Sequence, residues 1–81
     1  MSNYADFVPV FRAFNPVYGE IVETTTFRQA YEYARYESRA SLDNRCREWR
    51  LSRGYRPAEI VIIRVSTGEI LAKFPCLADP S

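Results

Sequence analysis

The longest periodic pattern in the chain runs from Thr26 to Arg53, where apolar residues recur with the period of an α-helix. Thr26 and Gln29 have the spacing of a capping box, in which two side chains satisfy free backbone donors at a helix start. Gly54 is the left-handed residue that commonly ends a helix, and Pro57 prevents the helix from resuming. The pattern therefore predicts a helical segment over residues 26–53.

One broad sector of this segment is expected to face the core, at about 100° per residue. It comprises Phe27, Ala30, Tyr31, Ala34, Ser38, Leu42, Arg45, Cys46 and Trp49. Polar side chains within residues 41–44 compete for local backbone hydrogen bonds, which predicts an interruption there. We expect one bent helix or two consecutive helices.

Aromatic and β-branched residues predict a first hairpin over residues 5–25, with strands at Phe7–Phe14 and Glu20–Thr24. A turn rich in proline and glycine separates the two strands. Pro9 cannot donate to a β-ladder. The first strand is therefore expected at an edge of the sheet, or with Pro9 on its open side.

A second hairpin is predicted over residues 59–75. Glu59–Val65 is a nearly unbroken apolar run, which indicates burial on both faces and a central position. A tight turn leads to a returning strand at Glu69–Phe74. Pro75 is expected to end that strand and to leave residues 76–81 as a loosely ordered tail.

The resulting order, ββαββ in a single domain over residues 1–81, predicts an α+β fold. It consists of an antiparallel sheet of about four strands with the helical segment on one face. One helix cannot cover both faces of a sheet. The uncovered face is therefore the first place to look for a partner.

Composition agrees with a folded globular chain, since 47% of the 81 residues are hydrophobic and 15% are aromatic. The net charge of +1 gives no global field that would drive binding to nucleic acid or to an anionic membrane. Charge is nevertheless uneven, because residues 28–56 hold eight of the ten arginines against four acidic residues. The simpler explanation for the excess of arginine over lysine is a GC-rich genome, and recognition of carboxylates or phosphates is a compatible alternative.

Cys46 and Cys76 have no CxxC spacing and read as reduced, partly buried thiols of a cytosolic protein. The N-terminus lacks the features of a signal peptide, and no segment has the length of a membrane span. We expect the protein in the cytoplasm, with no membrane contact.

Catalytic residue types are scarce. Histidine is absent, and the three glycines are too scattered for a phosphate loop. Cys46 lies among arginines that could activate it, and Glu20 and Glu69 occupy equivalent hairpin positions. A packed thiol and solvated carboxylates are the simpler interpretation. We expect no enzyme, no cofactor and no metal.

Two surfaces are candidates for binding. The helix face opposite the core sector combines tyrosine and arginine, residue types enriched at interface hot spots and able to stack on bases. The alternative is an ordinary solvated face, or a kink that turns some tyrosines inward. The second surface is the aromatic first strand, which could pair with another chain or be covered by the tail. The candidate partner-binding residues are Tyr33, Tyr36, Arg39, Arg47, Arg50, Phe7 and Phe11.

Two hairpins flanking an amphipathic helix, with TTFRQAYEYAR followed by EIVIIRVSTGEILAKF, resemble small phage and mobile-element proteins, in particular anti-CRISPR proteins. The resemblance lies in size and architecture and carries over no functional residue. It implies a non-enzymatic inhibitor that binds a Cas effector and blocks target DNA or nuclease recruitment. Many such inhibitors are acidic DNA mimics, whereas this chain is neutral with an arginine-rich helix. Occlusion of a subunit surface is therefore the mechanism that the resemblance implies here.

The leading hypothesis is a non-catalytic inhibitor in the cytoplasm of a bacterial host, monomeric or homodimeric, which binds a protein or ribonucleoprotein such as a Cas effector subunit. The second is a nucleic-acid-binding module that uses the same helix. The third is a self-associating structural domain in which the first strand pairs across a two-fold axis.

Overall fold

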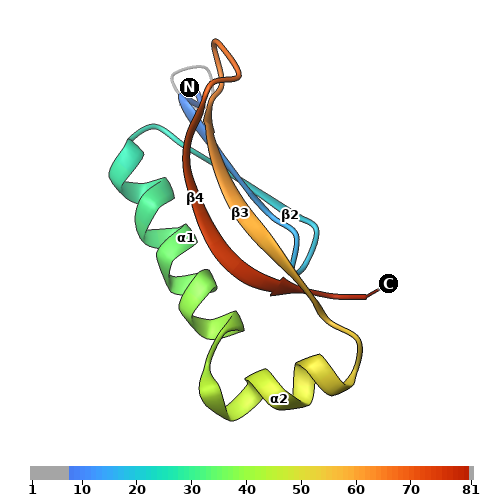
Figure 1. Ribbon diagram of the computed structural model, residues 1–81. Coiled ribbons are helices and arrows are strands. Elements are labelled where there is room, and N and C mark those ends of the chain that lie inside the picture. The colour runs from blue at the N-terminus through green and yellow to red at the C-terminus, as the bar shows by residue number, and fades with distance from the viewer. Residues whose placement is uncertain (1–7, 81) are drawn as a thin grey trace, which may run out of the picture.

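The chain folds as a four-stranded sheet with one helix on its face and a second helix beyond its end (Figure 1). The computed structural model describes residues 8–80. The elements are β1 (Phe11–Asn15), β2 (Glu20–Thr24), α1 (Phe27–Ser41), α2 (Asn44–Ser52), β3 (Arg56–Arg64) and β4 (Ile70–Ala78). The predicted α+β class, the antiparallel sheet and the two consecutive helices are confirmed.

The strands lie in the order β2-β1-β3-β4, and every neighbouring pair is antiparallel. The two hairpins join through β1 and β3, with Phe11 opposite Arg64 and Phe14 opposite Val61. The central position predicted for β3 is therefore confirmed, but its predicted burial on both faces is wrong, because Val61 and Ile63 are only partly buried. Of the two alternatives for the first strand, the edge position is wrong. Because β1 begins at Phe11, Pro9 lies before the strand and its missing donor does not interrupt the ladder.

The outer edge of β4 is hydrogen-bonded to α1. Ser38 Oγ donates to the carbonyl oxygen of Pro75 at 2.6 Å, and the amide of Leu77 donates to Ser41 Oγ at 3.3 Å. Backbone groups at these alternate positions therefore point away from β3, and the missing N–H of Pro75 removes no ladder bond. For this reason the expectation that Pro75 ends the strand is wrong, and β4 continues to Ala78.

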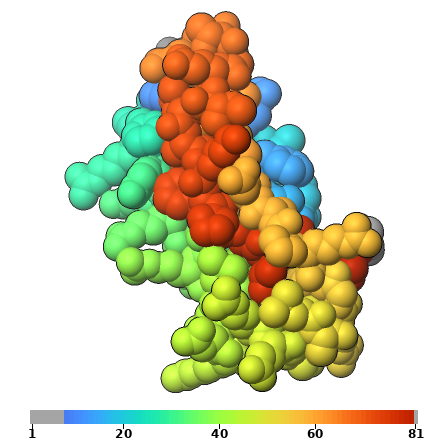
Figure 2. All heavy atoms as spheres, in the orientation of Figure 1, coloured from blue at the N-terminus to red at the C-terminus, as the bar shows by residue number. Residues whose placement is uncertain are grey.

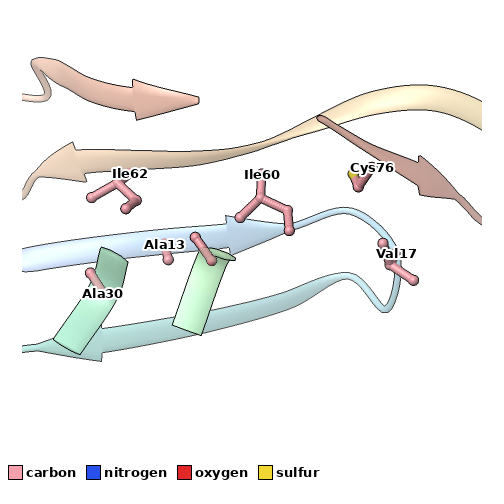
Figure 3. Packing of buried hydrophobic residues seen from close by; sticks show 7 residues of the cluster. Ala13, Val17, Ala30, Ile60, Ile62 and Cys76 are labelled. Carbon is pink, nitrogen blue, oxygen red and sulfur yellow. The ribbon is translucent and has the colours of Figure 1, made fainter. Parts of the chain in front are cut away.

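The core lies between α1 and the sheet and is built from small and branched side chains (Figure 3). Its buried members are Ala13, Val17, Ala30, Ala34, Ile60, Ile62 and Cys76. Alanines on both layers let the helix lie close to the sheet, and the two isoleucines of β3 fill the centre. Cys76 and Leu77 are 2% and 4% exposed and belong to β4, which extends to Ala78, so the expected loose tail is wrong for residues 76–78.

Aromatic rings form a row along one side of the helix–sheet interface. Phe11 contacts Phe27 at 5.7 Å between ring centroids, Phe27 contacts Tyr31 at 5.9 Å, and Tyr31 contacts Phe74 at 5.1 Å. The first and last of these pairs are edge-to-face, which suits the ring quadrupoles. The row thus ties the first turns of α1 to both β1 and β4.

A polar network ties the first hairpin to α1. Asn15 is fully buried; its Oδ1 accepts from the Val17 amide at 3.0 Å and its Nδ2 donates to the Tyr33 hydroxyl at 3.2 Å. The Tyr33 hydroxyl in turn donates to Glu20 at 2.6 Å. Burial, together with this hydrogen bond to Glu20, raises the pKa of Tyr33 to about 12. The network fixes the β1–β2 turn against the helix.

Candidate binding surface on the second helix

The helical segment divides at Leu42 and Asp43. The Leu42 amide donates to the Ser38 carbonyl and ends α1, and the Asp43 side chain then accepts from the Arg45 amide at 2.8 Å and begins α2. At the other end, Gly54 has φ 88°, the left-handed conformation that stops a helix. These local signals produce a separate helix of nine residues. We call residues 43–56 the arm.

The arm projects from the end of the domain, as a lobe below the sheet in Figure 2. None of the nine residues of α2, all of them described, is buried. The expectation that Trp49 faces the core is wrong, because the division at residues 42–43 turns α2 off the sheet and leaves Trp49 52% exposed. An isolated helix shorter than about 12 residues is marginal in water. The caps of α2 and contacts within the arm therefore hold it in place.

Arginines and aromatic rings interleave at the C-terminal end of the arm. The Arg53 guanidinium lies 4.6 Å from the ring centroid of Trp49, and that of Arg50 lies 5.8 Å from the centroid of Tyr55. The Trp49 and Tyr55 rings are 6.4 Å apart. Nη1 of Arg50 is shielded from solvent and has no hydrogen-bond partner among the described residues. Stacking thus positions two guanidinium groups without neutralising them.

The arm carries unbalanced positive charge. Residues 43–56 contain five arginines and two acidic residues, which gives a net charge of +3. The arginines are Arg45, Arg47, Arg50, Arg53 and Arg56. In the part of the chain that the structure describes, no ion pair joins any of them to a carboxylate. Like charges at i, i+3 spacing, as at residues 47, 50 and 53, repel each other on a helix. The arm therefore suits an anionic partner.

The predicted helix face is divided between the two helices. Arg47 is exposed on the arm, whereas Arg50 is half-buried against Tyr55. Tyr36 and Arg39 are exposed on α1. They border a shallow hollow of about 530 Å³, which is lined by Glu32, Arg35, Tyr36, Arg39, Ala40 and Asp43.

Two of the predicted residues face inward instead. Tyr33 is half-buried in the hydrogen-bond network with Asn15 and Glu20, because its position on α1 lies above the first hairpin. Phe11 lies on the helix-covered side of β1, against Phe27. Phe7 is outside the described residues.

The sequence pattern placed Trp49 in the core and predicted no binding role for Arg53 or Tyr55. The signal that could have found them is the polar interruption at residues 41–44 with Asp43 as a helix cap. A helix that restarts after a cap need not keep the core-facing sector of the helix before it.

The reactive residue types are dispersed. Cys46 is a free, half-buried thiol, and Cys76 is a free thiol in the core, where burial, followed by the charge of Glu59, raises its pKa. Glu20 and Glu69 lie near opposite ends of the sheet, the first bound to Tyr33 and the second 3.9 Å from Arg64. Among residues 8–80, no group of three or more His, Cys, Asp or Glu side chains could hold a metal ion.

The chain matches no protein-family model, no curated protein and no solved structure. Within residues 8–80, no helix is both long enough and apolar enough to cross a membrane. What the protein binds must therefore be argued from its own surface.

Proposed function

We propose that the protein is a non-catalytic inhibitor that acts in the cytoplasm of a bacterial host by covering a functional surface of a protein or ribonucleoprotein. A Cas effector complex is the target that the anti-CRISPR resemblance implies. The single observation that supports the proposal is the arm. Its helix α2 buries no residue, and its arginines have no carboxylate partner among residues 8–80.

The composition of the arm fits a macromolecular contact. Trp49 and Leu51 are 52% and 48% exposed, and they provide apolar area beside the guanidinium groups. Tryptophan and arginine are the residue types that most often dominate binding energy at interfaces. Guanidinium groups also bind carboxylates and phosphates in bidentate fashion. An acidic protein surface with an apolar centre is the partner that this combination suits best.

A charge-reversal pair tests the proposal. Arg45→Glu with Arg47→Glu changes two exposed residues of α2. The matched control, Arg28→Glu with Arg35→Glu, makes the same change of charge on exposed residues of α1. Tagged wild-type protein should retain a Cas effector subunit from nuclease-treated lysate of a bacterium with an active CRISPR system, and should restore plaque formation by a targeted phage.

The arm pair should lose both activities at least tenfold, whereas the control pair keeps them. Equal loss in both pairs would mean that net charge, and not the arm, makes the contact. A wild-type protein that neither retains a Cas subunit nor protects the phage would contradict the inhibitor proposal itself.

A second candidate function is binding of single-stranded nucleic acid by the arm. The observation in its favour is that arginines with no ion pair to a described carboxylate alternate with the Trp49 and Tyr55 rings, since bases stack on aromatic side chains. Four phosphate contacts would lower affinity about 50-fold between 50 and 200 mM salt, through counterion release. Binding that is lost on nuclease digestion and has this salt dependence would favour the second candidate. A flat salt response would favour the first.

A further inference from the structure

No helix of the described chain covers the face of the sheet turned away from α1, and this face is largely apolar. Side chains alternate along a strand, so that Phe14 and Val61 point away from α1 where their neighbours Ala13 and Ile62 point toward it. Figure 1 shows α1 along one side of the sheet only. The apolar residues on the opposite side, which we call the open face, are Phe14, Ile21, Val61, Ile63 and Ile70.

The open face is unusually apolar for a surface that meets water. A half-exposed antiparallel sheet normally carries polar residues on its solvent side. Here Ile21 is 58%, Ile70 54% and Phe14 43% exposed, on three different strands. On the side covered by α1, by contrast, the neighbour of Phe14 in β1 is the small residue Ala13. Contiguous exposed apolar surface of this kind marks an interaction site.

Charged groups on and beside the open face are paired among themselves. Arg12 donates from Nε and Nη2 to Glu23 at 2.8 and 2.6 Å, across the β1–β2 register. Lys73 lies 3.9 Å from Glu59 across β3 and β4. The face therefore presents neither excess positive nor excess negative charge. Such a surface can meet an identical surface without like-charge repulsion, which is what a two-fold interface requires.

We propose that two copies of this chain pack sheet against sheet through their open faces and form a two-fold dimer. The first strand does not pair with another chain by its edge, because β2 and β3 occupy both of its sides. Packed sheets lie about 10 Å apart with their strands about 30° from alignment, so the side chains of the two faces interdigitate. This contact is independent of the arm.

The area of the sheet determines how tightly the two copies are expected to bind. Two strands of five residues and two of nine give a flat area of about 450 Å², using about 4.8 Å between strands and about 3.4 Å per residue. Side-chain relief increases this area toward the roughly 800 Å² per partner of a standard interface. The dimer therefore belongs at the weak end of specific association and is expected to form with rising concentration.

Sedimentation equilibrium from micromolar to hundreds of micromolar tests the proposal. The wild-type mass should rise from 9.4 kDa toward twice that value. Ile21→Lys and Ile70→Lys, each at a position more than half exposed, should raise the dimer dissociation constant at least tenfold. Leu51→Lys is the matched control, since it places the same charge at a similarly exposed position on α2. A wild type that stays monomeric, or lysine variants that dimerise like the wild type, would overturn the proposal.

A second measurement uses the unaltered protein and does not depend on how the variants fold. Methyl resonances of Ile21, Ile63 and Ile70 should shift with concentration, while those of Ile60 and Ile62 in the core stay constant. Concentration-dependent shifts confined to other methyl groups would place the interface elsewhere and contradict the open-face dimer.

Discussion

Replacing Tyr33 by phenylalanine should cost about 2 kcal/mol of stability, because the hydroxyl group serves two partners. It donates to Glu20 at 2.6 Å and accepts from the fully buried Asn15 amide at 3.2 Å. A hydrogen bond to a charged group contributes about 1.5–3 kcal/mol, and leaving a buried donor unsatisfied costs about 1–3 kcal/mol. Exposure of Glu20 to solvent reduces the first contribution. A loss of about 2 kcal/mol corresponds to a fall of about 8–16 °C in Tm for a domain of this size.

The assay is urea unfolding at pH 7, followed by circular dichroism. Tyr36→Phe is the control, since Tyr36 is 65% exposed on the same helix and has no hydrogen bond within the described residues. A free-energy difference below about 0.5 kcal/mol for Tyr33→Phe, or an equal loss in both variants, would refute the reasoning.

Ionisation of the Tyr33 hydroxyl should make the stability difference between wild type and Tyr33→Phe depend on pH. In the unfolded chain Tyr33 ionises near pH 10, whereas the folded protein holds its pKa at about 12. The folded state therefore keeps a proton that the unfolded state has lost, and the stabilisation is complete below pH 10 and disappears as the pH rises toward 12. A difference of two pKa units sets an upper limit of about 2.7 kcal/mol on the stabilisation that depends on the protonated Tyr33 hydroxyl, and solvent screening lowers this value. The gap between wild type and Tyr33→Phe should close over this interval, and a gap that stays constant would contradict the assignment.

Three further outcomes are expected. Ser38→Ala removes the 2.6 Å hydrogen bond to the Pro75 carbonyl and should lower the urea-unfolding free energy by about 1 kcal/mol; an unchanged value would mean that water replaces the serine. Gly54→Ala, at φ 88°, should cost about 1–2 kcal/mol from backbone strain, and a stabilised variant would contradict the left-handed helix end. In the native protein a thiol reagent should modify half-buried Cys46 at least tenfold faster than buried Cys76, because burial slows access to Cys76 and raises its pKa. In denaturant the two thiols should react at equal rates. Equal rates in the native protein would be inconsistent with the core position of Cys76.

Much of the fold was predictable because local rules decide it. The Gln29 amide donates to the Thr26 hydroxyl as expected, whereas the Gln29 side chain accepts from the Thr25 hydroxyl and not from the Thr26 backbone amide. Gly19, Gly54 and Gly68 all adopt positive φ at predicted turns or ends. Strand extent was less predictable. β4 passes through Pro75 because Ser38 and Ser41, about one turn apart on α1, bond to its outer edge, a tertiary contact that a strand pattern does not contain.

Only part of the candidate site was predictable, because the orientation of α2 and the partners of Tyr33 also depend on tertiary structure. The faces were assigned at about 100° per residue, as on one continuous helix over residues 26–53. On such a helix Tyr33 faces solvent and Trp49 faces the core. The division after Leu42 gives α2 its own orientation, so Trp49 becomes exposed. Tyr33 turns inward because Asn15 and Glu20, from the distant first hairpin, provide polar partners at the rim of the core.

The serine contacts on β4 also limit how this protein can aggregate. Fibrils grow by adding strands to a free sheet edge, and growth without end requires two such edges on each molecule. In the second half of β4 the backbone groups at Pro75 and Leu77 are already bonded to α1, which leaves only Ile70–Lys73 to template an incoming strand. The β4 edge therefore offers an incoming strand a shorter template than its nine residues would allow, which disfavours growth through this edge. Loss of both Ser38 and Ser41 would free the second half of the edge and lengthen that template.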